Sequence, residues 1–278
     1  MLNKDNANSS NKKKIFRITG IIGIAYFAGG AALYYLQKKL MLHPKQLPPG
    51  YKFQFAFPFK EINIPFNKKD NINLVQFLPE KNMLKGVVLY FHGNRDNINR
   101  YAKYAVNFTK HGYEVWINDY PEYGKSTGKF TEDNVYRQAA QIYKLASAKF
   151  ESNNIIVYGK SLGSGIACWL ASKKVCRDVI LETPYYSMSE LLTRYAPIYP
   201  APFMSHFKFP TGEYLKEVNA PVIIFHGSKD KVIPHWHALK LKDVLKEKDE
   251  FITIENASHN NLNDFPLFHE KLDVILAR

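Results

Sequence analysis

The chain has 278 residues, of which 46% are hydrophobic, and it carries a formal net charge of +13. This size suits one large α/β domain with an appendage, and its two cysteines, Cys168 and Cys176, make neither a disulfide framework nor a zinc motif. Residues 1–45 hold +7 of the charge and no nucleic-acid-binding motif accompanies the rest, so we expect no nucleic-acid partner.

The N-terminus combines a basic start with a long apolar run. Residues 1–17 are rich in Lys, Asn and Ser, and we expect them to be disordered. Residues 18–37 contain no charged side chain, and twenty helical residues span about 30 Å, the thickness of the hydrocarbon core. The run therefore predicts a single transmembrane signal-anchor helix. A cleaved signal peptide, cut near residues 28–32, is the alternative.

The charges around this run predict its orientation. The preceding flank, with three consecutive lysines and Arg17, is more basic than the following one with Lys38 and Lys39. Because basic flanks stay in the cytoplasm, we expect the main domain on the non-cytoplasmic side of the membrane.

A regular alternation of apolar segments follows a Pro- and Gly-punctuated linker over residues 38–60. Strand-like runs occupy residues 61–66, 72–78, 86–91, 114–118, 154–158, 178–181, 221–225 and 251–255. Helix-like segments occupy residues 97–111, 131–150, 162–174, 235–247 and 266–277. The first two strands are expected to form a hairpin. The alternation predicts an α/β domain over residues 61–278, with a mostly parallel sheet and helices on both faces.

The run at 154–158 passes directly into the turn Gly159-Lys160-Ser161-Leu162-Gly163 and then into an apolar helix. This order is typical of a nucleophile elbow, in which a strained backbone lifts the serine hydroxyl above the sheet edge. The glycines leave room where helix and strand approach each other. Ser161 is therefore the predicted nucleophile, although the pentapeptide alone can equally be a turn or a helix cap.

Residues 185–216 interrupt the alternation and are rich in Tyr, Pro, Phe and Met. A long ordered excursion of this kind is typical of a small cap over an active site, so we expect a cap here. An ordinary irregular loop with a helix is the alternative.

Two later strand ends supply partners for Ser161. The strand at 221–225 leads to Asp230, and the strand at 251–255 leads through a short loop to His259. We expect His259 to take the proton of Ser161 and return it to the leaving group, while Asp230 orients the imidazole. Glu182, after the strand at 178–181, is the substitute acid.

The other histidines are assigned smaller roles. His226 ends a strand and is expected to be structural, and His92 is expected to lock a loop. His235 and His237, even with Asp230, do not match a compact zinc spacing, so no metal or cofactor is predicted.

The strand at 86–91 ends in His92-Gly93-Asn94, in the loop expected to offer one oxyanion-hole donor. We assign that donor to the backbone N–H of Asn94 and the second donor to that of Leu162. Both would stabilise the negative oxygen of an acyl-transfer transition state.

In sequence and order, these segments resemble the alpha/beta-hydrolase superfamily, and in particular its membrane-anchored serine hydrolases, which include lysophospholipases, monoacylglycerol-type lipases and acyl-protein thioesterases. The resemblance covers roughly residues 60–277. It implies the alpha/beta-hydrolase fold with a small cap insertion, and a triad of Ser161, Asp230 and His259. Pro121-Glu122 departs from the usual Arg-Gly and affects only local loop shape. The matching stretches are 91–94, 119–128, 159–165, 181–185, 226–234 and 258–262.

Together these features predict a membrane-tethered serine hydrolase of carboxylic esters or thioesters, acting on small-molecule or lipid-like acyl substrates. An aminopeptidase-like hydrolase of the same fold is a second possibility. It would need acidic groups for a substrate amine, and the cap region offers Glu190, Glu213 and Glu217. A catalytically silent scaffold is a third, against which the filled triad positions argue.

Overall fold

An eight-stranded sheet forms the centre of the protein in the computed structural model, which describes residues 2–80 and 83–278. The strands are β2 (Phe59–Pro65), β3 (Asn71–Phe77), β4 (Gly86–Phe91), β6 (Tyr113–Asn118), β7 (Ile155–Lys160), β8 (Asp178–Glu182), β9 (Val222–Gly227) and β10 (Glu250–Ile254). Their spatial order is β10-β9-β8-β7-β4-β6-β3-β2. The β2–β3 hairpin and the β3–β6 pair are antiparallel, and the other neighbours are parallel. The predicted strands and hairpin are confirmed.

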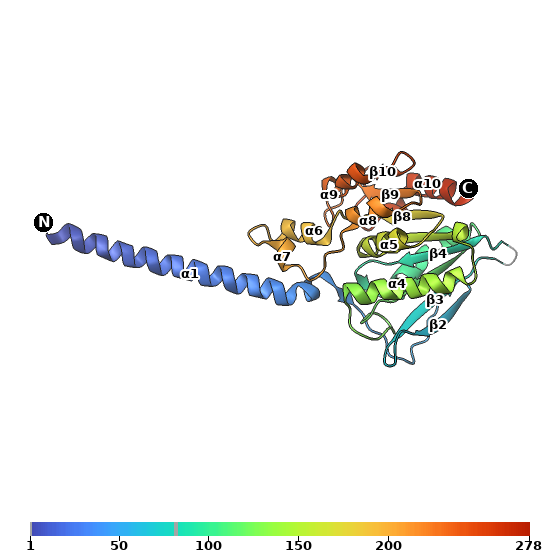
Figure 1. Cartoon of the computed structure of the whole chain (residues 1–278), viewed down its shortest axis with the longest axis horizontal. Coiled ribbons are helices and arrows are strands. Elements are labelled where there is room, and N and C mark those ends of the chain that lie inside the picture. The colour runs from blue at the N-terminus through green and yellow to red at the C-terminus, as the bar shows by residue number, and fades with distance from the viewer. Residues whose placement is uncertain (1, 81–82) are drawn as a thin grey trace.

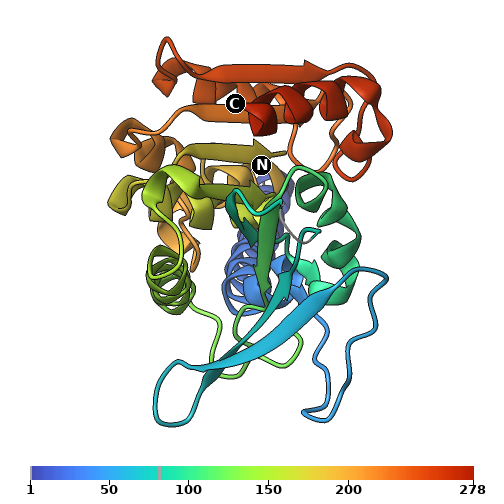
Figure 2. The ribbon, with the colours of Figure 1, turned by 90° about the vertical axis from the view of Figure 1, so that its right-hand side faces the viewer.

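Helices cover both faces of this sheet, as predicted (Figures 1 and 2). On one face lie α4 (Glu132–Ser147), α5 (Leu162–Lys173) and α8 (Thr211–Glu217), and on the other lie α2 (Ile98–Tyr101), α3 (Val106–Thr109) and α10 (Pro266–Ala277). Successive strand residues alternate between two cores, so that Leu89 joins the first and Tyr90 the second. Burial on both faces explains why the strands are continuous apolar runs.

Two predicted helices are broken in the structure. The segment at 97–111 becomes α2, a 3₁₀ turn at Ala102–Tyr104 and α3, while that at 235–247 becomes α9 (His235–Leu239) and a 3₁₀ turn at Lys240–Val244. Burial of Tyr101 and Phe108 in the core fixes the path of the first segment. Packing of this kind overrides the helical tendency of the sequence.

The N-terminal helix α1 runs from Leu2 to Met41 and projects far from the body (Figure 1). Residues 2–17, for which the sequence predicted disorder, form the first part of this helix in the structure. The apolar run provides the costly nucleus of the helix, and propagation from it adds one hydrogen bond for each residue. Within the described residues, α1 alone has the length and composition to cross a membrane, from Lys13 to Met41, with a mean hydropathy of 1.5 over an 18-residue window.

The segment after α1 follows the surface of the body and is bound to it. β1 (His43–Pro44) pairs in parallel with β5 (Arg95–Asp96), and the N–H of Leu47 donates to the carbonyl oxygen of Gly124 at 2.8 Å. Phe53 is buried. The predicted linker over residues 38–60 thus starts inside α1 and is part of the packed structure.

The cap predicted for residues 185–216 consists of three helices. These are α6 (Met188–Tyr195), α7 (Ala201–Met204) and α8. α8 packs against α5 on the sheet face, whereas α6 and α7 lie beside α1 (Figure 1). The covering part is therefore smaller than predicted and ends before α8.

Candidate functional site

Ser161 occupies the sharp turn between β7 and α5, with φ 51° and ψ −116°. For a residue with a Cβ atom this conformation costs about 1–3 kcal/mol, so its surroundings must hold it. Its N–H donates to the carbonyl oxygen of Glu182 at 2.9 Å. A Cβ at Gly163 would lie 2.0 Å from the carbonyl oxygen of Phe91. The glycine therefore permits the close helix–strand contact that the sequence predicted.

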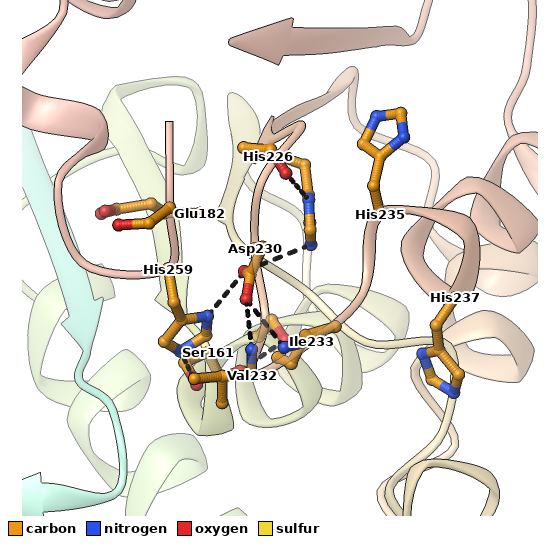
Figure 3. A network of polar contacts seen from close by, with 12 residues as sticks. Ser161, Glu182, His226, Asp230, Val232, Ile233, His235, His237 and His259 are labelled. Carbon is orange, nitrogen blue, oxygen red and sulfur yellow. Dashed lines mark hydrogen bonds and ion pairs between the residues drawn. The ribbon is translucent and has the colours of Figure 1, made fainter. Parts of the chain in front are cut away.

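The three predicted triad side chains lie in one hydrogen-bonded line (Figure 3). Nε2 of His259 is 3.0 Å from Oγ of Ser161, and its Nδ1 is 2.7 Å from Oδ2 of Asp230. The other carboxylate oxygen of Asp230 accepts from the N–H groups of Val232 and Ile233, both at 2.8 Å. A carboxylate at Nδ1 keeps the proton there, so Nε2 is free to accept the proton of the serine.

The two predicted oxyanion donors, Asn94 and Leu162, line the same cavity as Ser161. Among the described residues, neither backbone N–H has a hydrogen-bond acceptor. Two hydrogen bonds hold the backbone at Asn94 in place. The carbonyl oxygen of Asn94 accepts from the Tyr123 hydroxyl at 2.8 Å and from the N–H of His43 at 2.9 Å. Two unpaired N–H groups beside a nucleophile can receive an oxyanion.

The remaining histidines lie outside this line. Nδ1 of His92 contacts the carbonyl oxygen of Gly93 at 2.7 Å, in keeping with a role in the loop. His226 is buried 3.7 Å from Asp230, and burial lowers the pKa of its imidazole to about 4, so it is neutral at neutral pH.

His235 contacts the Thr253 hydroxyl, and His237 accepts from the N–H of Tyr186. Figure 3 places both away from Ser161. The described residues contain no cluster of three potential metal ligands.

Glu182, the substitute acid, has a different set of partners. Its carboxylate accepts from Nζ of Lys160 and from the hydroxyl of Tyr158, and all three side chains are buried. Sequence reasoning found no role for Lys160. Their pairing could have been predicted, because Lys160 ends one apolar strand and Glu182 ends the next strand along the chain. Asp230, and not Glu182, contacts His259.

A cavity of about 420 Å³ lies over Ser161. Its walls are mainly apolar, and they come from α6, the end of α1 and the segment after Asp230. Arg95 is the one permanently charged residue among the described lining residues, and none of them is acidic. An apolar site of this volume with a few polar groups at one end is typical of small-molecule sites.

Comparisons with known proteins agree with this fold. A family model described as serine aminopeptidase, S33, matches residues 82–209. Alpha/beta hydrolase domain-containing protein 17C of Xenopus tropicalis is 29% identical over 196 residues, which cover 68% of this chain but only 61% of that protein. The human 17B protein is 27% identical over 200 residues, covering 70% of this chain and 67% of that protein.

Solved structures show the same architecture. An esterase of Pyrococcus furiosus superposes with a TM-score of 0.64 at 18% identity, covering 85% of this chain and 96% of the esterase. A 2,6-dihydroxy-pseudo-oxynicotine hydrolase gives a TM-score of 0.65 at 17% identity, covering 80% of this chain and 68% of that protein. At these identities the likeness establishes the fold.

Proposed function

The chain belongs to the alpha/beta-hydrolase superfamily, and we propose that it is a membrane-tethered serine hydrolase that cleaves carboxylic ester or thioester bonds of acyl substrates. The observation that carries this proposal is the line from Ser161 through His259 to Asp230, with the serine held in a strained turn. These three residues are assigned as nucleophile, general base and orienting acid.

The chemistry follows from these positions. Oγ of Ser161 attacks the carbonyl carbon while its proton passes to Nε2 of His259. The oxyanion accepts hydrogen bonds from the N–H groups of Asn94 and Leu162. The alcohol or thiol then leaves with the proton from Nε2. Water then attacks the acyl-enzyme while one of its protons passes to Nε2 of His259. His259 returns that proton to Oγ of Ser161 as the carboxylic acid is released, which restores the free enzyme.

The lining of the cavity favours an acyl group over a peptide amine. An aminopeptidase needs an acidic group to hold the substrate's ammonium, and none of the described lining residues is acidic. Glu190 instead pairs with Lys240, Glu213 with Lys216, and Glu217 with Lys173. The amide-cleaving alternative is therefore the weaker one.

Covalent labelling tests the nucleophile. The full chain in detergent should react with a fluorophosphonate, and Ser161→Ala should abolish the reaction. Ser172→Ala is the matched control, since this serine lies near the end of α5 and its hydroxyl donates to the carbonyl oxygen of Trp169. Equal labelling of wild type and Ser161→Ala would exclude Ser161. Folded, labelled protein that turns over no ester or thioester would favour a silent scaffold.

We also propose that residues 18–37 span the membrane and that residues 61–278 form the catalytic domain on the non-cytoplasmic side. The apolar length of α1 and its more basic N-terminal flank support this orientation. Protease added to sealed inside-out vesicles should leave the domain intact. Digestion of the domain under those conditions would reverse the orientation.

A further inference from the structure

The anchor helix contributes directly to the candidate active site. Leu33, Leu40 and Met41 of α1 line the same cavity as Ser161. Met188, Leu192 and Tyr195 of α6 are among the residues that line it from the cap. A helix that only tethers a domain has no need to form a wall of its catalytic cavity.

Specific contacts fix α1 against the cap. Gln37, with 1% of its surface exposed, donates through Nε2 to the carbonyl oxygen of Met204 at 2.9 Å and accepts from the N–H of His206 at 2.7 Å. Closer to the N-terminus of α1, the Tyr26 ring stacks on the Tyr199 ring, with the ring centroids 4.9 Å apart. Their polar groups also bond, since the Tyr199 hydroxyl donates to the carbonyl oxygen of Tyr26 at 3.1 Å.

A glycine of α1 makes this approach possible. A Cβ at Gly29 would lie 2.3 Å from the hydroxyl oxygen of Tyr199, so a larger residue would displace that side chain from α1. At its other end α1 is tied to the body by the Lys38–Glu122 ion pair at 2.6 Å. The wall is therefore held at both ends, and its position relative to Ser161 is fixed.

The part of the wall formed by Leu33 lies within the proposed membrane span, whereas Leu40 and Met41 follow that span. Leu33 belongs to the uncharged run that ends at Gln37, about 6 Å inside that end at about 1.5 Å per helical residue. On the cap, Ile198 and Phe203 are 67% and 91% exposed. The carbonyl oxygen of Ile198 accepts from the Tyr26 hydroxyl of α1, and Phe203 precedes Met204, whose carbonyl oxygen accepts from Gln37. Exposed apolar side chains next to a spanning helix are stable in contact with lipid and not with water.

We propose that α1 is one wall of the acyl-binding site, and that the acyl chain of a membrane-resident lipid ester or thioester enters from the bilayer along α1. The bound acyl chain lies between α1 and α6, and its carbonyl carbon lies at Ser161. This inference rests on the proposed hydrolase function and names its substrate class as long-chain acyl lipids. It makes Leu33 and Leu192 determinants of chain length.

Filling the cavity from the helix side tests the wall. Leu33→Trp in the full chain, reconstituted in phosphatidylcholine vesicles, should lower kcat/KM for a palmitoyl ester by about tenfold or more, a loss of about 1.4 kcal/mol in transition-state binding. The ratio of palmitoyl to butyryl turnover should fall by the same factor, and labelling by a small fluorophosphonate should persist. Leu36→Trp is the control, because Leu36 lies on the same helix, is 49% exposed and does not line the cavity.

The outcomes separate the two proposals. Wild type that is not labelled would overturn the hydrolase function itself. Labelled Leu33→Trp with unchanged palmitoyl turnover would overturn the wall alone, as would an equal loss in Leu36→Trp. If Leu33→Trp is not labelled, Leu192→Trp fills the same cavity from α6 and should give the same selective loss. Unchanged palmitoyl turnover in labelled Leu192→Trp would then refute the binding mode.

Discussion

Replacing Asp230 by asparagine keeps the shape of the side chain and removes its charge. In the native site the carboxylate accepts from Nδ1 of His259 at 2.7 Å and from two backbone N–H groups at 2.8 Å. The amide can still accept from the backbone through its oxygen, but it then presents an N–H to Nδ1. The imidazole must carry its proton on Nε2, where it cannot accept that of Ser161. In serine proteases the same change lowers kcat by about 10⁴, and we expect about 10³–10⁴ here.

Asp249 provides a matched control for this substitution. Its carboxylate is also inaccessible and accepts from the N–H groups of Val222 at 2.9 Å and Lys246 at 2.8 Å, but no described histidine contacts it. Asp249→Asn removes a carboxylate charge away from the candidate triad, but the two oxygens of Asp249 accept from different N–H groups, so the amide can satisfy only one of them. Both variants should lose about 1–3 kcal/mol of unfolding free energy, because charged acceptors of backbone N–H groups become neutral.

The assay compares kcat for a short-chain ester with the free energy of unfolding in urea. We expect Asp249→Asn to lose at least as much stability as Asp230→Asn, and activity to be lost in Asp230→Asn alone. If Asp230→Asn keeps kcat within about tenfold of wild type, Asp230 does not fix the imidazole tautomer. Equal losses of activity in both variants would attribute the effect to folding and refute the argument from chemistry.

Three further predictions concern the support of the site. Gly163→Ala places a Cβ 2.0 Å from the carbonyl oxygen of Phe91 and should lower both thermal stability and fluorophosphonate labelling, whereas Gly20→Ala meets nothing within 4 Å and should change neither. Burial lowers the pKa of His226 to about 4 in the folded protein, below its value in the unfolded chain. At a pH between these two pKa values, the imidazole is protonated in the unfolded state and neutral in the folded state. His226 should therefore contribute about 3 kcal/mol to a decrease in the unfolding free energy as pH falls from about 6.5 towards 4, and His226→Asn should remove that contribution in urea titrations at several pH values. Burial also lowers the pKa of His237 to about 4, so part of the decrease should remain in this variant. Lys160→Met leaves the Glu182 charge buried without its cation and should lower the unfolding free energy by about 3–5 kcal/mol. In a double-mutant cycle, adding Glu182→Gln should recover part of this loss. Strictly additive losses would show that the two side chains are not coupled.

Most of the sheet was predictable, because its strands are buried on both faces and read as short apolar runs. The run from Gly86 to Phe91 has no polar residue and matches β4 at both ends. The site residues were predictable for a related reason. Carboxyl ends of parallel strands meet at one edge, so side chains just after β7, β9 and β10 come together. The structure places Ser161, Asp230 and His259 in contact in this way.

The sequence did not predict features that depend on contacts between distant segments. Glu122 was read as a departure from a family pattern that affects only loop shape, but its carboxylate pairs with Lys38 at the end of α1. Residues 38–60 looked like a free linker because prolines and glycine punctuate them, yet their backbone bonds to the body. Local composition reports which segments lack regular structure. It does not report what they pack against.

The ends of β7 and β8 show why the proposed nucleophile and the core cannot be separated. Lys160 and Glu182 are register partners on β7 and β8, and their side chains form the buried ion pair. The next residue, Ser161, donates its N–H to the carbonyl oxygen of the same glutamate, while Ser164 donates to the Ser161 carbonyl oxygen from both its N–H and its hydroxyl. These bonds over-determine the backbone at Ser161, so the strain of about 1–3 kcal/mol is held by the strand pair and not by the triad. A change that loosens β8 at Glu182 should therefore misplace Ser161 even when His259 and Asp230 are untouched.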